Sequence, residues 1–341
     1  MKKYLLPENG TFFKANLHCH SVVSDGKLTP ERLKEIYKEK GYSIIAYTDH
    51  DVFIQHNDLS DENFLALNGY EMEIDESKDC QFSDKKTTHI CFIALEKDNN
   101  RQVCYHRNKY VWGNALEYRK YVNFDESLPD YERHRTPEGV SEIMKISRDS
   151  GFFVTYNHPK WSLESYDDYS LYEGMHAMEI CNFGCVNEGY GDYNPEVYDN
   201  ILRTGKRIYC IATDDNHNFH PLDSVRCDSF GGFTMIKADK LEYKTITNAL
   251  LAGNFYASQG PLINSLVFED GYIYINCSNA KRIIMNTGHR RTEWAENIGS
   301  SINEAKFKVN LDDIYVRITV IDKEGKPANT NAYFVDELYN L

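Results

Sequence analysis

Two histidines separated by one residue, His18 and His20, follow a short apolar run and are the first residues that point to chemistry. On an extended strand, side chains at i and i+2 point to the same side, so both imidazoles can reach one metal ion. Asp25 follows in the loop beyond, within Ser24–Asp25–Gly26, where its carboxylate can fold back over that ion. One His-x-His pair is a weak signal, so the prediction of a metal site depends on similar residues after other strands.

Further imidazoles and carboxylates stand at the ends of other strand-like runs. They are Asp49, His50 and Asp51; Glu71; His89; His158; and Asp214, Asp215 and His217. His89 is the exception because it begins its run, so that strand is shorter than the run or the ligand comes from the preceding loop. Mixed imidazole and carboxylate ligands suit zinc, manganese or iron. Since one ion takes three or four protein ligands, six histidines and at least three carboxylates predict two or three ions.

Seven apolar, β-branched or aromatic runs are the predicted strands that position these residues. They span residues 12–18, 43–49, 64–71, 88–95, 151–158, 176–181 and 207–214. Predicted helices between them begin at Thr29–Pro30–Glu31, Thr136–Pro137–Glu138 and Asn194–Pro195–Glu196, and each is followed by a glycine. Alternating strands and helices predict a parallel α/β barrel or doubly wound sheet, with its chemistry at the carboxyl ends of the strands.

The chain is predicted to divide into a large α/β domain, residues 1–260, and a small all-β, sandwich-like domain, residues 261–341. The second prediction follows from short alternating runs separated by turn signals after about residue 260. Residues 96–135 are rich in Tyr, Arg and Asn, and are predicted to be an insertion that forms a lid or shapes the substrate site. A helix is predicted over residues 239–252.

Composition and charge limit the class of protein. The chain has 341 residues, of which 41% are hydrophobic and 26% charged, as in a soluble globular protein. Its formal net charge of −14 argues against broad contact with nucleic acid or anionic membrane. Nine scattered cysteines, no signal-peptide run and no apolar stretch of membrane-spanning length predict a cytoplasmic protein with free thiols.

Taken in order, these motifs resemble those of the PHP (polymerase and histidinol phosphatase) family. They are His18–Cys19–His20 with Ser24–Asp25–Gly26, then Thr48–Asp49–His50–Asp51, Gly69–Tyr70–Glu71, His89, Asn157–His158–Pro159 and Asp215–Asn216–His217. The resemblance covers roughly residues 12–260. It implies a distorted seven-stranded (β/α) barrel of PHP type with two or three metals at the strand ends. The tail resembles that of stand-alone members with a C-terminal β domain.

Carried over by position, the resemblance implies three groups of metal ligands that are also the catalytic residues. They are His18, His20 and Asp215 for one ion; Glu71 as a bridge, His89 and His158 for a second; and Asp25, His50 and His217 for a third. Two positions leave a choice. The spacing favours Asp215 over Asp214 and Glu71 over Glu73, with Asp214 then a supporting or structural residue.

Three further residues near the motifs are candidates for supporting the ligands or binding the substrate. Asp49 either orients an imidazole or caps its strand. Lys160 follows His158 and Pro159 directly and is the candidate for binding the substrate phosphate. Trp161 either stacks on a ring of the substrate or packs under its loop.

The sequence therefore predicts a metal-dependent phosphoesterase, in which a metal-activated hydroxide attacks phosphorus in a small phosphorylated substrate, a phosphomonoester or nucleotide-like molecule. The acidic net charge disfavours a nucleic-acid polymer, which needs a basic track. One alternative is a metal-dependent hydrolase of a non-phosphate bond such as an amide. Another is a non-catalytic, metal-stabilised binding module that uses its β domain to recognise a partner or glycan.

Overall fold

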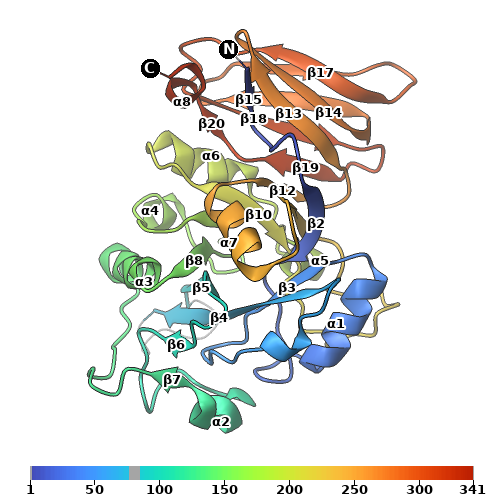
Figure 1. The fold of residues 1–341 in the computed structure, drawn as a ribbon. Coiled ribbons are helices and arrows are strands. Elements are labelled where there is room, and N and C mark those ends of the chain that lie inside the picture. Colours follow the sequence, from blue (N-terminus) through green and yellow to red (C-terminus); the bar gives the residue numbers. More distant parts are fainter. Residues whose placement is uncertain (1, 77–84, 341) are drawn as a thin grey trace.

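The computed structural model describes residues 2–76 and 85–340 and shows a mixed α/β molecule organised around one large sheet (Figure 1). Within these residues the sheet has 14 strands. Their order is β10-β9-β8-β5-β4-β3-β2-β11-β12-β19-β18-β15-β16, with β20 paired to β18. The half of the sheet from β10 to β2 carries the predicted site residues at its ends.

Each of the seven predicted runs contains a strand of this half. The strands are β2 (Thr11–Asn16), β3 (Ile44–Tyr47), β4 (Leu65–Asp75), β5 (Thr87–Ala94), β8 (Phe152–Tyr156), β9 (Ala177–Asn182) and β10 (Tyr209–Thr213). Apart from the first four residues of β2, they are buried almost throughout, which explains why their sequences form continuous apolar runs rather than alternating patterns.

The prediction of an all-parallel arrangement is wrong for β5. The pairs β2–β3, β3–β4, β8–β9 and β9–β10 are parallel, but β5 is antiparallel to both β4 and β8. A reversed strand brings its first residues to the edge where its neighbours end. His89, near the start of β5, therefore lies at the same edge as the residues that follow the parallel strands, which accounts for its unusual position in the sequence.

The predicted closure into a seven-stranded barrel is not confirmed. Beyond β2, the sheet continues through β11 (Phe233–Ala238) and β12 (Phe255–Ser258), which the sequence reading missed and which pair antiparallel. The hydroxyl of Thr234 on β11 accepts a hydrogen bond from Ala212 N on β10 (3.2 Å) and donates one to Ala212 O (3.0 Å). The two ends of this half thus approach each other through a side chain, with no backbone ladder between β10 and β11 in the described chain.

Four longer helices occupy the predicted positions: α1 (Pro30–Glu39), α3 (Pro137–Asp149), α6 (Pro195–Arg203) and α7 (Tyr243–Leu251). Thr29 caps α1 by accepting a hydrogen bond from Arg32 N, and Thr136 caps α3 in the same way through Gly139 N. The buried face of α1 is Leu33, Ile36 and Tyr37, as its spacing predicts. The shorter helices are η1 (Asn57–Leu59), α4 (Tyr166–Tyr169), α5 (Phe183–Glu188) and α8 (Val335–Tyr339).

The predicted insertion packs against the loops that follow β2 and β3. It contains β6 (Arg101–Gln102), α2 (Ala115–Tyr118), η3 (Arg119–Tyr121) and β7 (Asn123–Phe124), and it lies at one end of the molecule in Figure 1. Its apolar residues Val111, Ala115 and Val122 form a small buried cluster with Val23 and Val52. The insertion is therefore held in place by its own core next to the loops that bear site residues.

The C-terminal strands form two packed layers. One layer is a sheet of order β1-β13-β14-β17, built from β1 (Lys2–Tyr4), β13 (Ile263–Glu269), β14 (Tyr272–Ala280) and β17 (Ile302–Lys308). The other continues the large sheet through β15 (Arg282–Thr287), β16 (Thr292–Ala295), β18 (Tyr315–Ile321), β19 (Pro327–Thr330) and β20 (Tyr333–Phe334). Apolar side chains of both layers, including Leu266, Ile273, Ile283 and Ile318, share one core.

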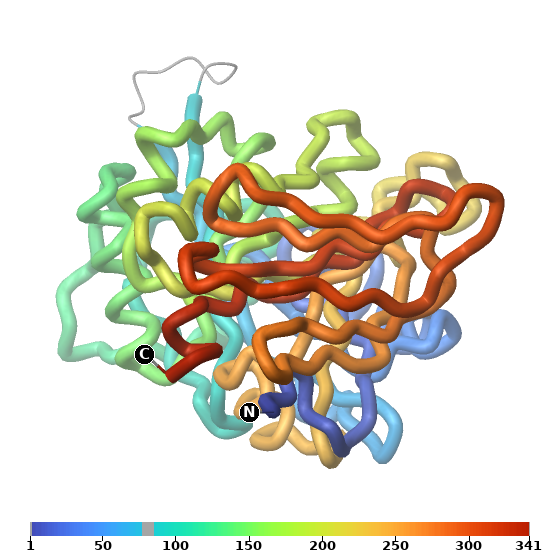
Figure 2. The backbone as a smooth tube through the Cα atoms, turned by 90° about the horizontal axis from the view of Figure 1, so that it is seen from above, coloured from blue at the N-terminus to red at the C-terminus, as the bar shows by residue number. Residues whose placement is uncertain are grey.

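Two features of this region were not predicted. The N-terminal strand β1 pairs with β13, and the chain termini lie close together (Figure 2), with Lys3 Nζ donating to Asn340 Oδ1 at 2.6 Å. The region also joins the large sheet through β12 and β19 and ends in helix α8. An independent all-β domain is therefore not confirmed, and the boundary near residue 260 stays a prediction.

No helix in residues 2–76 and 85–340 has both the length and the apolar character needed to cross a membrane. The cysteines in the described part of the chain are free, as their scattered spacing predicts.

Candidate metal centre

The structure brings all nine predicted ligands together at one edge of the sheet, and these residues are mostly buried. Their imidazole and carboxylate atoms form overlapping groups in which the possible ligand atoms lie within 4.8 Å of one another. The groups are His18, His20, Glu71 and Asp215; His20, Asp25, His50 and His217; His50, Glu71 and His89; and His18, His158 and Glu179. Of these residues, only Glu179 was absent from the sequence prediction.

Glu71 lies at the centre of the cluster and is fully buried. Its two oxygens face five imidazole nitrogens at 3.2–3.3 Å: Oε2 faces those of His18, His20 and His50, and Oε1 those of His89 and His158. The alternative residue, Glu73, lies 3.7 Å from His89 Nε2, at the border of the cluster. The structure thus places Glu71 where a bridging carboxylate is expected.

The two neighbouring aspartates have separate roles. Asp215 Oδ1 lies 3.1 Å from His18 Nε2 and 3.0 Å from His20 Nε2, inside the cluster. Asp214 points away and accepts hydrogen bonds from the backbone N–H groups of residues 230–232 and from the hydroxyl of Tyr37, at 2.8–2.9 Å. The spacing argument for Asp215 therefore agrees with the geometry, and Asp214 holds the loop before β11.

Asp25 and His217 form the outer side of the cluster. Asp25 Oδ2 lies 3.3 Å from His217 Nε2, and Asp25 Oδ1 lies 3.7 Å from His20 Nδ1. The His20 and His217 rings stack with centroids 4.2 Å apart and planes 15° apart. His20 thus presents one ring nitrogen to this outer group and the other to Glu71 and Asp215, which joins the inner and outer groups.

The residues fit divalent cations because several polar atoms at the centre are buried without a hydrogen bond from any described residue. They are His20 Nδ1, His50 Nδ1, His89 Nε2, Glu71 Oε2 and Asp215 Oδ1. Leaving a buried polar atom unsatisfied costs about 1–3 kcal/mol. An arrangement that concentrates such atoms within a few ångströms is explained by coordination, and the nitrogen and oxygen donors suit a divalent transition metal.

The carboxylates change the proton affinity of the imidazoles. Burial lowers the pKa of His20, but the close contacts of its imidazole with the carboxylates of Asp215 and Glu71 outweigh burial and raise the pKa to about 10. Burial also opposes the charged form of His89, and the charge of Glu71 raises its pKa well above the usual range. For His50, burial together with repulsion from His20 lowers the pKa to about 4. A metal must compete with protons at these nitrogens, so binding is coupled to proton release.

Glu179 is the supporting residue that sequence reasoning missed. It accepts a hydrogen bond from His18 Nδ1 (2.8 Å), and Thr213 Oγ1, His158 N and Asn182 Nδ2 donate to the same carboxylate at 2.6–3.0 Å. With Nδ1 held in this way, the Nε2 atom of His18 faces the cluster. The available signal was a charged residue within the otherwise apolar run 176–181.

Asp49 and Asn157 hold parts of the cluster in place. Asp49 accepts four hydrogen bonds, at 2.8–3.1 Å, from the backbone and hydroxyl groups of Ser21 and Ser24. It therefore holds the loop that carries Asp25, which favours the strand-capping interpretation over direct orientation of an imidazole. Asn157 Nδ2 donates to Glu71 Oε1 at 3.0 Å and fixes the central carboxylate.

Arg133 connects the insertion to this edge of the sheet. Its guanidinium donates to Asp51 Oδ1 at 2.6 Å and to the carbonyl of Glu73 at 2.7 Å, and it stacks over the ring of Tyr110 at 4.1 Å. Gln102 Nε2 also donates to the carbonyl of Asp51, at 2.9 Å. The insertion thus supports the loop after His50 and the strand that bears Glu71.

The cluster opens into a cavity of about 570 Å³. Lys160, the predicted phosphate ligand, is not among its lining residues, because its Nζ donates to the carbonyl of Gly191 at 3.0 Å. Trp161 does line the cavity, with its ring 5.0 Å from that of His158. The lysine of the cavity wall is Lys85, which is paired with Asp75.

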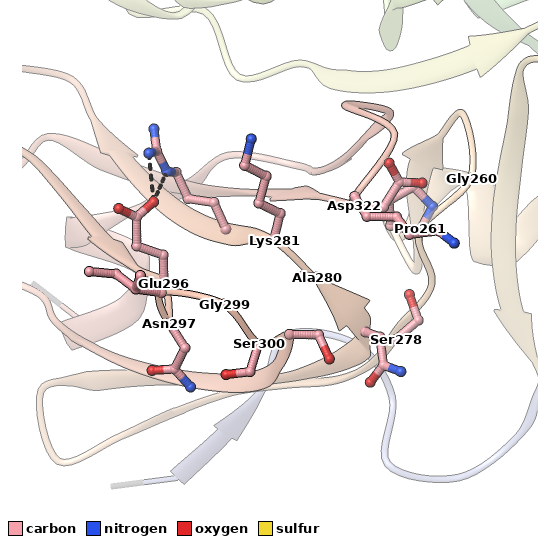
Figure 3. A pocket seen from close by; sticks show the side chains of 15 residues that line it. Gly260, Pro261, Ser278, Ala280, Lys281, Glu296, Asn297, Gly299, Ser300 and Asp322 are labelled. Atoms are coloured by element: carbon pink, nitrogen blue, oxygen red, sulfur yellow. Dashed lines mark hydrogen bonds and ion pairs between the residues drawn. The ribbon is translucent and has the colours of Figure 1, made fainter.

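A larger cavity, of about 840 Å³, lies among the C-terminal strands (Figure 3). Ser278, Lys281, Asn297 and Ser300 contribute to its wall. Glu296, which is paired with Arg282, also lines it. None of its lining residues is a histidine or cysteine, so it offers no comparable set of metal ligands.

No family model matches this sequence, and no curated protein matches it. The fold is similar to that of a two-domain protein from Bacteroides vulgatus that contains a predicted PHP-like metal-dependent phosphoesterase. That chain shows 16% identity and a TM-score of 0.45, and the match covers 97% of each chain. A candidate metal-dependent phosphoesterase from Bifidobacterium adolescentis matches with 16% identity and a TM-score of 0.37, over 62% of this chain and 89% of its own.

An amidohydrolase from Chromobacterium violaceum, with bound sulfate and no metal, matches with 14% identity and a TM-score of 0.34, over 60% of this chain and 87% of its own.

Proposed function

We propose that the protein is a cytoplasmic, metal-dependent phosphoesterase that hydrolyses a small phosphorylated molecule. The observation that supports this most strongly is the convergence of six imidazoles and three carboxylates at one cavity, with Glu71 at the centre of the group. Structural histidines on a sheet edge normally find hydrogen-bond partners, whereas several atoms in this cluster have none in the described chain.

The proposed ligand sets are those that the motifs imply. His18, His20 and Asp215 would hold one ion, and His89 and His158 would hold a second, with Glu71 available to both. Asp25, His50 and His217 would hold a third ion at the outer side. The first and third sets each lie within one geometric group, whereas the second takes His89 and His158 from two different groups. The proposed metals are zinc, manganese or iron, because the site mixes neutral nitrogen donors with carboxylates.

Divalent ions held there supply Lewis-acid catalysis, since they neutralise charge on phosphoryl oxygens and make water nucleophilic near neutral pH. In the reaction, a P–O bond forms to the oxygen of water, the ester P–O bond breaks, and the leaving oxygen takes up the proton that water gives up. The chain itself positions the ligands: Glu179 orients His18, Asn157 holds Glu71, and Asp49 holds the loop of Asp25.

The proposed substrate is small because the cavity is small and acidic. A volume of about 570 Å³ matches a single small-molecule ligand. Acidic side chains predominate in its wall and the whole chain carries a formal charge of −14, which disfavours a nucleic-acid polymer.

The test is hydrolysis of a phosphomonoester, a phosphodiester and an amide by metal-loaded protein. We expect ester hydrolysis that falls at least about 100-fold in His18→Ala. The matched control is His289→Ala, because His289 is exposed and lies among the C-terminal strands; its activity should equal that of the wild type.

Two outcomes would contradict the proposal. Turnover of amides without esters would indicate a hydrolase of another bond. Full metal content without turnover of any substrate, together with binding to a protein or glycan partner that survives metal removal, would indicate a binding module.

A further inference from the structure

The rings around the mouth of the cavity are separate from the predicted ligands. Trp112, from the insertion, lies with its ring 5.6 Å from that of His50. Phe219, after β10, lies nearly parallel to His217, with planes 13° apart and centroids 5.8 Å apart. Trp161, after β8, lies 5.2 Å from His89. Three segments far apart in sequence thus place aromatic rings beside the cluster.

Two of these rings are exposed although they are large and apolar. Trp112 keeps 45% and Phe219 keeps 56% of their surface accessible. Single exposed apolar side chains are common on protein surfaces, and Trp294 is exposed to 61%. What distinguishes Trp112 and Phe219 is that both line the same cavity beside the cluster. Exposed apolar groups gathered at a polar cavity mark a ligand-binding surface.

Most charged side chains that line this cavity are acidic. Beyond the ligand cluster, Glu73, Asp75, Glu188 and Asp228 line the cavity. Lys85 supplies the only ammonium or guanidinium group in the lining formed by the described residues, and it is paired with Asp75.

The neighbouring cations are turned to other partners. Arg133 is bound to Asp51 and to the carbonyl of Glu73, and Lys160 is bound to the carbonyl of Gly191. Lys27 is the exception at the outer edge, where its Nζ lies 4.5 Å from the centroid of the Phe219 ring. Among the described residues, the phosphoryl group of a substrate therefore finds positive charge mainly at the metal site, and the rest of the molecule meets rings and carboxylates.

We propose that this mouth selects a phosphoester whose leaving group is a flat ring without negative charge. The inference rests on the proposed function. A flat ring can stack on Trp112, Trp161 or Phe219, whereas a second anionic group beside Glu73 or Glu188 meets repulsion.

The test uses two pairs of phosphomonoesters, each with leaving groups of similar reactivity. The first compares benzyl with cyclohexylmethyl phosphate, which differ in the flatness of the ring. We expect kcat/KM to favour the benzyl ester by about fivefold. The second compares para-carbamoylbenzyl with para-carboxybenzyl phosphate, which differ in one negative charge. We expect the charged ester to be about fivefold worse.

Three variants and two matched controls test whether these preferences arise at the mouth of the cavity. Trp112→Ala should bring the benzyl preference close to unity with unchanged metal content, and Trp112→Phe should keep part of it. Trp294→Ala is the control, since Trp294 is an exposed tryptophan on β16. Glu188→Gln should reduce the penalty of the carboxylate, whereas Glu304→Gln, an exposed glutamate on β17, should not.

A second measurement does not depend on turnover: binding of benzylphosphonate and cyclohexylmethylphosphonate to metal-loaded wild type and Trp112→Ala. Equal turnover and equal binding of the flat and non-flat members would overturn the inference and leave the phosphoesterase proposal standing. If no ester is hydrolysed, the proposed function fails. In that case, phosphonate binding alone tests the preference for a flat ring. Tighter binding of benzylphosphonate that is lost in Trp112→Ala supports the inference, and equal binding of the two phosphonates overturns it.

Discussion

The cavity beside the metal cluster and the cavity among the C-terminal strands differ in whether the polar groups of their walls are paired. The cavity among the C-terminal strands is larger, about 840 Å³ against about 570 Å³, and two of its charged residues, Arg282 and Glu296, are paired with each other. At the smaller cavity, Glu71, His20 and Asp215 are buried and present atoms without hydrogen bonds in the described chain. Volume alone therefore does not identify a candidate metal site. Buried ligand atoms that converge without hydrogen bonds do identify one.

The two cavities also differ in the buried side chains that hold their walls in place. Glu179, Asp49 and Asp214 are buried carboxylates that accept several hydrogen bonds each and fix the strand ends and loops of the cluster. The wall of the C-terminal cavity includes exposed residues 296–301, which have no comparable buried support. Preorganisation of this kind is expected for a site that must hold several ligands in fixed positions.

The largest expected effect comes from the centre of the cluster. Glu71→Gln removes the carboxylate charge shared by five imidazoles, so we expect loss of bound metal and an activity at least about 100-fold lower. Elemental analysis and ester hydrolysis measure both. Glu296→Gln, in the other cavity, is the matched control and should retain both. Full metal content in Glu71→Gln would contradict the central role of Glu71.

A smaller loss is expected one step away from the ligands. Glu179→Gln weakens the acceptor that orients His18, so metal affinity should fall about 10–100-fold while the fold is retained. Competition with a chelator measures the affinity, and circular dichroism checks the fold. An affinity equal to that of the wild type would show that Glu179 does not position His18.

Stability should distinguish the two regions as well. Asp214→Asn places an amide group against three backbone N–H donors and the Tyr37 hydroxyl, which should lower the free energy of unfolding by about 2–3 kcal/mol. Asp322→Asn changes a carboxylate that accepts from Glu324 N and Lys326 N in a surface turn, and should cost less than about 1 kcal/mol. Urea unfolding measures both, and equal losses would contradict the comparison.

Metal binding should depend on pH in a defined direction. The carboxylates raise the pKa of His20 to about 10 and that of His89 above its usual range, so without metal these nitrogens hold protons at neutral pH. Because binding must displace those protons, metal affinity should rise with pH over about pH 6 to 9. Titration at several pH values tests this, and a flat or falling affinity would contradict it.

The smallest effect is expected in the larger cavity. Lys281→Ala changes an exposed residue of its wall, so metal content should be unchanged and ester hydrolysis should stay within about twofold of the wild type. A large loss of turnover in this variant would show that the C-terminal cavity takes part in the reaction.

The sequence predicted those parts of the structure that depend on local pattern. The seven strands and the starts of α1, α3 and α6 follow from apolar runs and capping residues. The direction of β5 was not predictable in this way, since it depends on which neighbours the strand pairs with. The strand β11 was missed because no chemistry-bearing motif marks it, although it borders β2.

The same distinction holds for the site. The strand-end motifs and their resemblance to the PHP family indicated the nine residues that the structure brings together, and spacing within the motifs favoured Asp215 over Asp214 and Glu71 over Glu73. Glu179 was missed because its role depends on a contact with His18, which lies 161 positions away in the sequence. Lys160 was chosen from its adjacency to His158, but its side chain turns to Gly191, and adjacency in sequence does not fix side-chain direction.

The most direct test of the central claim is anomalous X-ray scattering from crystals of metal-loaded protein, measured at the zinc, manganese and iron absorption edges. We predict at least two anomalous peaks within the cluster, each about 2.0–2.3 Å from imidazole nitrogens or carboxylate oxygens, with Glu71 contacting two of them. Crystals with no peak among these residues, or with ions bound only elsewhere, would contradict the account.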